Sequence, residues 1–291
     1  MQSLIIDPPI PYAIPPGPLA IMLVGCGGTG SHLAQSLARL AAHCRDAGLP
    51  PVYLSFIDGD VVESKNVGRQ LFCPAEIGQN KAQTLAARFN AALGMRIMAI
   101  PRMATKDMIW SLIPPDETAV GLVIGAVDSA QGRQVLSDAL SSTRCRMWLD
   151  CGNHEHSGQV ALGTHTRLDL LTGCLKLGGL CTALPAPSLQ YPELLRPAPD
   201  RPRADCAAAM QDNAQSLMIN QMMAAVAGQY ISQIAIQRRV TTFQTTVDLQ
   251  SLSMRSMPIT AANLAQACGV TEAILRGEHH TKTKRKKGAV A

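Results

Sequence analysis

Four glycines in the segment Gly25-Cys-Gly-Gly-Thr-Gly30 have a spacing that indicates chemistry. They follow the apolar run Ile21–Val24 and precede a helical pattern. Gly25 permits a tight turn, Gly27 lets the backbone approach a phosphate or ribose, and Gly30 allows the helix to pack closely on the strand. The N–H groups that open such a helix favour an anion. The segment predicts a nucleotide pocket, although this turn serves NAD, FAD, S-adenosylmethionine and ATP alike.

Asp58 directly follows a second apolar run, Val52–Ile57. Nucleotide-binding folds place a carboxylate at such a strand end, where it accepts hydrogen bonds from ribose hydroxyls. The alternative is a solvated loop aspartate. Polar and basic residues come next, in Asp58-Gly-Asp60-Val-Val-Glu-Ser64-Lys-Asn66-Val-Gly-Arg69-Gln70 and Gly78-Gln-Asn-Lys81. Hydride transfer needs no such set, so the sequence disfavours a dehydrogenase.

Alternating strands and helices must position these residues. Apolar runs at Ile21–Val24, Val52–Ile57 and Val120–Val127 are separated by helical patterns such as Ser31–Ala47. This alternation predicts an α/β, Rossmann-like fold, with a mostly parallel sheet and helices on both faces. Beyond Gly158 we expect a strand, a proline-rich loop, a long helix near 208–237 and a strand near 241–249. These C-terminal elements extend the sheet.

Five motifs in this order resemble those of the ThiF-like adenylyltransferases. They are the glycine turn, Asp58-x-Asp60, Ser64-x-Asn66-x-x-Arg69-Gln70, Gly78-x-x-Lys81 and Asp128 after an apolar strand. The superfamily includes ubiquitin-activating enzymes, the molybdopterin-synthase adenylyltransferase and the thiamine-pathway enzyme, and the resemblance covers about residues 20–165. Further segments resemble the ThiF-related branch of the plasmid-borne PRTRC cassette, namely Trp148-Leu-Asp150-Cys-Gly152-Asn153, Gly158-Gln159, Cys206 and Met218-Ile219-Asn220-Gln221.

The resemblance implies an adenylation reaction, in which a carboxylate attacks the α-phosphate of ATP and pyrophosphate leaves. It implies that Asp58 holds the ribose and that Asp128 holds Mg²⁺. It also implies that Asn66, Arg69 and Lys81 reach the phosphates. Position and charge are the catalytic means in such chemistry, because cations offset the charge that develops on phosphoryl oxygens. The implied nucleotide-binding set is Gly25, Gly27, Gly28, Gly30, Asp58, Asp60, Asn66, Arg69, Gln70, Lys81 and Asp128, and the implied catalytic set is Arg69, Lys81, Asp128 and Cys206.

Three of these residues have simpler interpretations. Lys81 is equally compatible with a surface lysine at a helix start, and Arg69 with a salt bridge within a loop. Asp128 is a good N-cap for a helix that begins near Ser129, and this role is compatible with metal binding.

The N-terminus departs from the family pattern. Activating enzymes of this family commonly contribute an arginine ahead of the glycine turn, often from the partner subunit. Residues 1–38 here contain neither Arg nor Lys, and prolines at 8, 9, 11, 15 and 16 predict an extended arm on the surface or across a neighbour. This absence favours a rival function, a ThiF-like scaffold that binds nucleotide without turnover in a plasmid-associated assembly.

The nine cysteines include no Cys-x-x-Cys pair, so no structural zinc is expected. Cys174, Cys181 and Cys206 lie near one another in sequence but lack an evident fourth ligand. Cys206 follows a proline-rich stretch and precedes a helical pattern, where the resemblance implies a crossover loop that delivers a thiol to the acyl-adenylate. A helix N-terminus lowers the pKa of a thiol. Transfer to a Cys206 thioester is therefore a secondary hypothesis, and a small buried residue is the alternative.

The formal net charge of +5 comes from the C-terminal tail. Its five cations are Lys282, Lys284, Arg285, Lys286 and Lys287, and the remaining 21 basic and 21 acidic residues cancel. The tail carries no aromatic residues for base stacking, so it favours solubility over nonspecific contact with nucleic acid or an acidic partner. Polar residues interrupt the long helix, no signal peptide is visible and the cysteines are unpaired, which indicates a cytoplasmic protein without a membrane span.

The sequence predicts three segments. They are a proline-rich N-terminal arm over 1–19, a ThiF-like adenylation domain over 20–277 with a crossover loop at about 173–207, and a basic disordered tail over 278–291. We expect ATP and Mg²⁺ as cofactors, a small ubiquitin-like or sulfur-carrier protein as the partner, and a homodimer by family resemblance and by the symmetry habits of oligomers.

Overall fold

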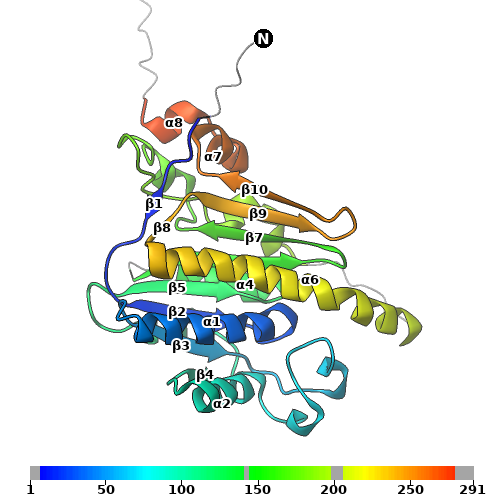
Figure 1. Cartoon of the computed structure of the whole chain (residues 1–291). Helices are drawn as coiled ribbons and strands as arrows, with labels where there is room; N and C mark the ends of the chain where they lie inside the picture. The colour runs from blue at the N-terminus through cyan, green and yellow to red at the C-terminus, as the bar shows by residue number, and fades with distance from the viewer. Residues whose placement is uncertain (1–6, 141–143, 198–205, 279–291) are drawn as a thin grey trace, which may run out of the picture.

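The computed structural model describes residues 7–140, 144–197 and 206–278, and in the long helix α6 (Cys206–Ser232) it describes side chains from Met218 onward. An eight-stranded sheet forms the centre (Figure 1). Its strands are β2 (Leu19–Val24), β3 (Val52–Ile57), β4 (Met98–Ile100), β5 (Val120–Gly125), β6 (Cys145–Asn153), β7 (Ser157–Gly163), β9 (Thr242–Asp248) and β10 (Ser253–Pro258). Their spatial order is β10-β9-β7-β6-β5-β2-β3-β4.

The strands from β6 to β4 are parallel to one another, and β7, β9 and β10 add an antiparallel extension. Every residue of β2 and β5 is buried, which explains their continuous apolar sequences. In register, Leu23 of β2 lies between Phe56 of β3 and Ile124 of β5. The predicted mostly parallel α/β fold is confirmed.

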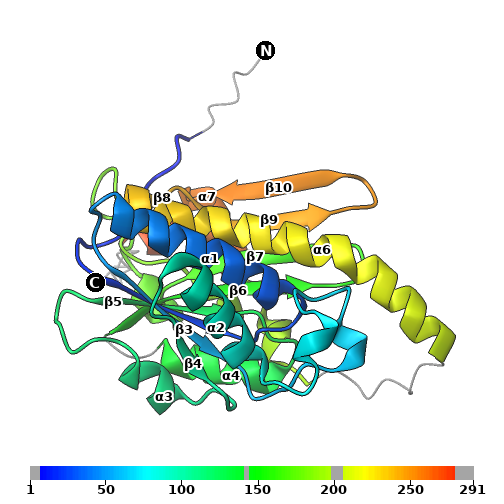
Figure 2. The same cartoon turned by 60° about the horizontal axis from the view of Figure 1, so that its bottom comes forward.

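Helices cover both faces of the sheet. The face with the larger core carries α1 (Gly28–Asp46), α2 (Lys81–Leu93) and α6, and Figure 2 shows α1 and α6 side by side. The other face carries α3 (Lys106–Ser111), α4 (Ala130–Ala139) and α5 (Pro187–Gln190) over a smaller core around Trp148. Two short helices, α7 (Ala261–Cys268) and α8 (Glu272–Arg276), follow β10.

The long helix predicted near 208–237 is α6 followed by a π-helical turn, Gln233–Gln237. Arg238 then ends the helix with a left-handed backbone, at φ 52°. Within the parts of the chain that the structure describes, no helix is long and apolar enough to cross a membrane.

The N-terminal arm lies against its own chain from residue 7 onward. Strand β1 (Tyr12–Ala13) pairs antiparallel with β8 (Arg239–Val240), and Tyr12 and Ile14 join the larger core. The Arg238 guanidinium donates a hydrogen bond to the Gly17 carbonyl oxygen at 2.7 Å. Within residues 7–19 of the predicted arm, Tyr12 and Ile14 are thus buried against the rest of the chain.

The predicted crossover segment is packed into the protein over most of its described length. Cys174, Leu175, Cys181 and Leu184 are buried, and the N–H of Leu175 donates to the carbonyl oxygen of Leu275 in α8. Residues 198–205 of this segment and residues 279–291 of the predicted basic tail lie outside the described residues.

Candidate functional site

The glycine turn joins β2 to α1 at the carboxyl end of the parallel strands. Gly25 has a φ of +89°, and a Cβ there would lie 2.5 Å from the Ala126 carbonyl oxygen. A Cβ on Gly30 would lie 1.9 Å from the Gly25 carbonyl oxygen. The turn and the close helix–strand contact therefore require glycine at both positions, as the spacing predicted.

The first turn of α1 presents free backbone donors. The first hydrogen bond of the helix joins the Ser31 N–H to the Gly27 carbonyl oxygen at 3.0 Å. The N–H groups of Gly28, Thr29 and Gly30 donate to no other described residue. Donors of this kind at a helix N-terminus bind anions.

Asp58 is tied to the glycine turn. Its carboxylate accepts hydrogen bonds from the N–H of Cys26 at 2.6 Å and of Asp60 at 2.8 Å. Burial raises the pKa of Asp58 above its ordinary value, and the two N–H groups oppose that shift. Asp58 is thus not a freely solvated loop residue, and its remaining lone pairs can accept hydroxyl groups.

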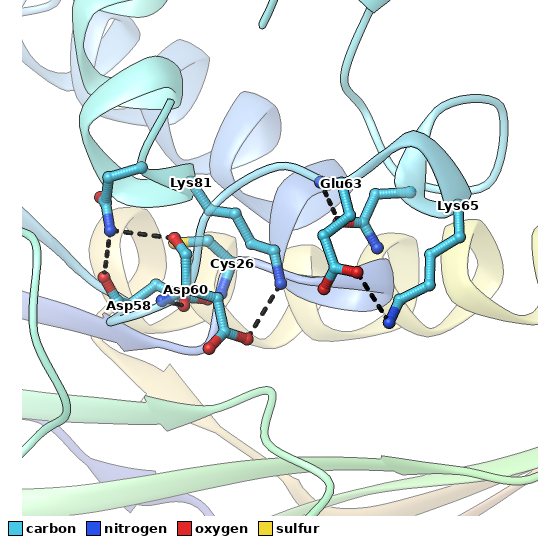
Figure 3. A network of polar contacts seen from close by, with 8 residues as sticks. Cys26, Asp58, Asp60, Glu63, Lys65 and Lys81 are labelled. Atoms are coloured by element: carbon cyan, nitrogen blue, oxygen red, sulfur yellow. Dashed lines mark hydrogen bonds and ion pairs between the residues drawn. The ribbon is translucent and has the colours of Figure 1, made fainter. Parts of the chain in front are cut away.

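Lys81 begins α2 and pairs with Asp60, as Figure 3 shows. Its Nζ lies 3.0 Å from Asp60 Oδ2, and the Lys81 side chain is 8% exposed whereas that of Asp60 is 56% exposed. Asn80 caps the helix, and its Nδ2 donates to the carbonyl oxygens of Asp58 and Asp60. Lys81 does lie at a helix start, but the interpretation as a surface lysine is wrong because its side chain is buried.

The segment that carries Asn66, Arg69 and Gln70 folds over the start of α1. Asn66 is buried, and its Oδ1 accepts the Glu63 N–H at 2.8 Å, which closes a short 3₁₀ turn. The Leu71 N–H donates to Ser31 Oγ at 3.0 Å and so fixes the segment to α1. The amide oxygen thus accepts a local hydrogen bond, and the amide nitrogen Nδ2 is the donor that a phosphate oxygen would need.

Unpaired polar atoms are concentrated in this region. Arg69 Nε, Gln70 Oε1 and His32 Nε2 are three of the six buried side-chain polar atoms that lack a partner among the described residues. Gln70 Nε2 lies 3.9 Å from the position of a Cβ on Gly27. Buried polar groups are normally paired, so this concentration indicates a missing ligand or solvent. No ion pair joins Arg69 to an acidic residue in residues 7–140, 144–197 and 206–278, contrary to the salt-bridge alternative.

Asp128 lies at the same edge of the sheet. It follows β5, whose last residue Gly125 pairs with Val24 just before the glycine turn. Helix α1 follows β2 on one face and α4 follows β5 on the other, which is the strand-order reversal where α/β folds bind ligands. The Asp128 side chain is exposed and forms no hydrogen bond or ion pair with a described residue.

The predicted N-cap role of Asp128 is wrong. Ser129 caps α4, and its Oγ accepts the Gly132 N–H at 3.1 Å. Asp and Ser are both good N-caps, and the helix begins one residue too late for Asp128. The Asp128 carboxylate therefore has no partner in the part of the chain that the structure describes. No three His, Cys, Asp or Glu side chains in the described chain lie close enough together to hold a metal ion by themselves.

An ion pair that sequence reasoning missed lies beneath Asp128. Arg133 Nε of α4 is 3.2 Å from Asp150 Oδ2 of β6, and the Asp150 side chain is 1% exposed. Arg133 Nη1 also lies 3.5 Å from the Asp128 carbonyl oxygen. An aspartate inside the apolar run of β6 was the available signal, since a buried carboxylate requires a partner.

This pair predicts a pH dependence of stability. Burial raises the pKa of Asp150 to about 6, and Arg133 only partly opposes the shift. The folded state therefore holds a proton that the unfolded state releases near its ordinary pKa of 3.8. We compare the unfolding free energies of the wild type and of Asp150→Asn. The wild-type value minus the variant value should fall by up to about 3 kcal/mol as the pH rises from 3.8 to about 6. Above that pH the difference should stay constant. Urea unfolding of both proteins from pH 4.5 to 7.5 measures the difference. A difference that is constant or rises with pH would contradict this assignment.

The cysteines occupy different environments. Cys26 in the glycine turn is fully buried, as are Cys174 and Cys181. Helix α6 begins at Cys206, but the side chain of this residue lies outside what the structure describes. The Cys206 thioester hypothesis thus stays a prediction. His154 and His156 lie in the tight turn between β6 and β7.

The site brings together most of the residues predicted from sequence. The glycine turn, Asp58, Asp60 and Lys81 are linked by hydrogen bonds, and Arg69 and Gln70 lie in the segment fixed to α1. Its free backbone donors lie at the start of α1, and its cations belong to segments hydrogen-bonded to the glycine turn or to α1. The arrangement can bind an anionic group beside a hydroxyl-bearing one.

Comparison with known proteins agrees with this fold. A family model, described as the ThiF family, matches residues 18–270. The adenylyltransferase and sulfurtransferase MOCS3 of Mus musculus is 36% identical over 124 residues, which cover 41% of this chain and 24% of that protein. The match thus spans about a quarter of this relative.

Solved structures share the fold at low identity. MccB of E. coli, solved with AMPCPP and MccA, has a TM-score of 0.52 at 14% identity, over 82% of this chain and 63% of that chain. PaaA has a TM-score of 0.50 at 15% identity, over 82% of this chain and 64% of that chain. The chain covers less than two thirds of the length of these structures. Because the family match runs from the start of the central sheet past α7, this chain belongs to the ThiF family.

Proposed function

We propose that this protein is an ATP- and Mg²⁺-dependent adenylyltransferase that activates the C-terminal carboxylate of a small ubiquitin-like or sulfur-carrier protein. In this reaction a carboxylate oxygen bonds to the α-phosphorus of ATP, and the bond to pyrophosphate breaks. The adenylyltransferase activity in the name of MOCS3 and the presence of ATP in a solved MccB structure support the proposal. A flexible tail ending in glycine is the kind of substrate that can thread into such a pocket.

One observation carries the proposal, namely that the first turn of α1 has backbone donors without acceptors and that the segments hydrogen-bonded to the glycine turn and to α1 carry two cations. The N–H groups of Gly28, Thr29 and Gly30 have no acceptor, and Arg69 has no acidic partner among the described residues. Lys81 is held in place by Asp60. Fixed charges of this kind stabilise a transferring phosphoryl group without reorganising during the reaction.

In this proposal Asp58 accepts the ribose hydroxyls, and Asn66, Arg69, Gln70 and Lys81 contact the phosphates. Lys81 has its stem buried and its ammonium group anchored, so little side-chain freedom remains to be lost on binding. Asp60 takes a supporting part, because it orients Lys81.

Asp128 fits the proposed Mg²⁺. Its carboxylate is exposed, has no partner among the described residues and lies at the edge of the sheet that carries the glycine turn. Mg²⁺ in nucleotide sites is held by one or two carboxylates together with substrate phosphates and water, so a larger protein cluster is not needed. When bound, the ion would be held by Asp128 and would supply positive charge that offsets the charge of the phosphates.

Thermal unfolding tests the nucleotide site without knowledge of the partner. ATP should raise the midpoint of unfolding, and Mg²⁺ should add a further increment that Asp128→Asn loses. A ligand at 100 times its dissociation constant adds about 2.7 kcal/mol, enough to raise the midpoint by several degrees. Asp107→Asn is the matched control, since Asp107 is exposed at the start of α3. Stabilisation by NAD⁺ or S-adenosylmethionine in place of ATP would overturn the proposal.

The second candidate is a nucleotide-binding scaffold without turnover, in a plasmid-associated assembly of the PRTRC type. The absence of Arg and Lys from residues 1–38 favours it. Pyrophosphate exchange that depends on a protein tail ending in glycine separates the two, because a scaffold binds ATP but exchanges no pyrophosphate. The enzyme proposal extends to a thioester if the activated protein forms an adduct with this chain that added thiols cleave. Cys206→Ala should not form this adduct. We also propose a homodimer, which sedimentation of the intact chain tests.

A further inference from the structure

Asn220 is a polar residue in an apolar stretch of α6. Its side chain is 5% exposed, and its helix neighbours Ile219 and Met223 are fully buried. A buried amide is costly unless its donors and acceptor are hydrogen-bonded. We therefore expect the Asn220 amide to have hydrogen-bond partners in the protein or in a ligand.

The Asn220 amide joins three elements that are far apart in sequence. Its Oδ1 accepts hydrogen bonds from Thr29 Oγ1 at 3.1 Å and from Asn153 Nδ2 at 2.8 Å. Thr29 lies in the first turn of α1, and Asn153 is the last residue of β6. The amide oxygen is thus satisfied and its orientation is fixed.

The same amide lies directly over the glycine turn. A Cβ on Gly28 would be 2.6 Å from both Asn220 Oδ1 and Asn220 Nδ2. Gly28 is therefore required for a reason that the turn geometry alone does not give. Because glycine has no Cβ, Gly28 leaves room for the Asn220 side chain of α6.

The described parts of the chain hold no acceptor for the amide nitrogen. Asn220 Nδ2 donates to no residue in the described parts of the chain, although the side chain is more than nine-tenths buried. It lies beside Gly28, whose N–H group, like those of Thr29 and Gly30 in the same helix turn, has no acceptor among the described residues. A cluster of donors at a helix N-terminus is suited to a phosphate oxygen.

We propose that Asn220 Nδ2 donates a hydrogen bond to a phosphate oxygen of the nucleotide at the glycine turn. This inference rests on the proposed function, and it adds α6 to the nucleotide site. Thr29 and Asn153 are positioning residues, because they hold the amide through its oxygen and leave its nitrogen beside Gly28 without an acceptor among the described residues. The ligand class is an adenine nucleotide with at least one phosphate.

Asn220→Asp tests the proposal with little change of shape. The carboxylate keeps acceptor oxygens for Thr29 and Asn153, but it removes the donor and places negative charge beside the phosphate. Calorimetric titration, well below the unfolding temperature, should show ATP and AMP binding about 10- to 100-fold more weakly. Adenosine lacks a phosphate and should bind with unchanged affinity.

Asn263→Asp is the matched control, because Asn263 lies in α7 and its Nδ2 donates to the Pro258 carbonyl oxygen. It should leave the ATP affinity unchanged. Asn220→Ser, which is neutral and smaller, serves if Asn220→Asp fails to fold, and it should weaken ATP and AMP but not adenosine.

Three results would be decisive against the proposal. Equal losses for adenosine, AMP and ATP would make Asn220 only a structural residue, and unchanged ATP affinity in Asn220→Asp would remove the phosphate contact. If the wild-type chain binds none of the three ligands, the proposed function itself fails, and the wild-type titration alone reveals that case.

Discussion

Lys81→Met should lower the rate of ATP–pyrophosphate exchange by at least about 100-fold, since removing one fixed donor to a developing oxyanion typically costs this much. Methionine keeps the buried stem and deletes only the ammonium group. Asp60 then loses its partner, but its side chain is 56% exposed and can be solvated, so the fold should persist. Exchange measured with small proteins that end in glycine tests the rate, and calorimetry with ATP tests binding separately.

The matched control is Lys65→Met. Lys65 also pairs with a carboxylate, Glu63 at 2.9 Å, and Figure 3 shows both pairs in the same network. Its side chain is 61% exposed, and exposed ion pairs contribute little to stability. Exchange should therefore stay within about twofold of the wild-type rate in this variant. Equal effects of the two substitutions would contradict a specific role for Lys81.

The central strands could be predicted from sequence because burial on both sides demands continuous apolar runs. The runs at 21–24, 52–57 and 120–127 correspond to β2, β3 and β5. The glycine turn could be predicted equally well, since local backbone geometry sets the spacing of its glycines. Asp58 belongs to this class as well, because it directly follows its strand.

Contacts between distant segments could not be predicted in the same way. Asn220 meets Thr29 across 191 residues and Asn153 across 67, and no local pattern records either contact. The Arg133–Asp150 pair joins a helix to the next strand along the chain and depends on how α4 packs. Tyr12 and Ile14 are buried beside residues 238–240 and Cys181, which are far from the arm in sequence.

The largest expected loss of stability comes from Gly30→Ala. A Cβ at this position would lie 1.9 Å from the carbonyl oxygen of Gly25, which is backbone and cannot rotate away. Relief requires α1 to move off β2 or the turn to open, and we expect a cost of at least about 3 kcal/mol. Either movement also displaces the N–H groups that are proposed to bind phosphate, so ATP affinity should fall in the fraction that remains folded.

Gly228→Ala separates this contact from the general effect of adding a methyl group to a helix. Gly228 lies inside α6, and a Cβ there would be 3.7 Å from Ser36 Cβ, an ordinary contact. Alanine in a helix interior is favoured over glycine by about 0.5–1 kcal/mol, so this variant should be as stable as the wild type or more so. Urea unfolding of both variants measures the difference. If the unfolding free energy of Gly30→Ala is instead within about 1 kcal/mol of the wild-type value, α1 can shift at little cost. The glycine turn would then not be the rigid anion site on which the proposed nucleotide chemistry depends.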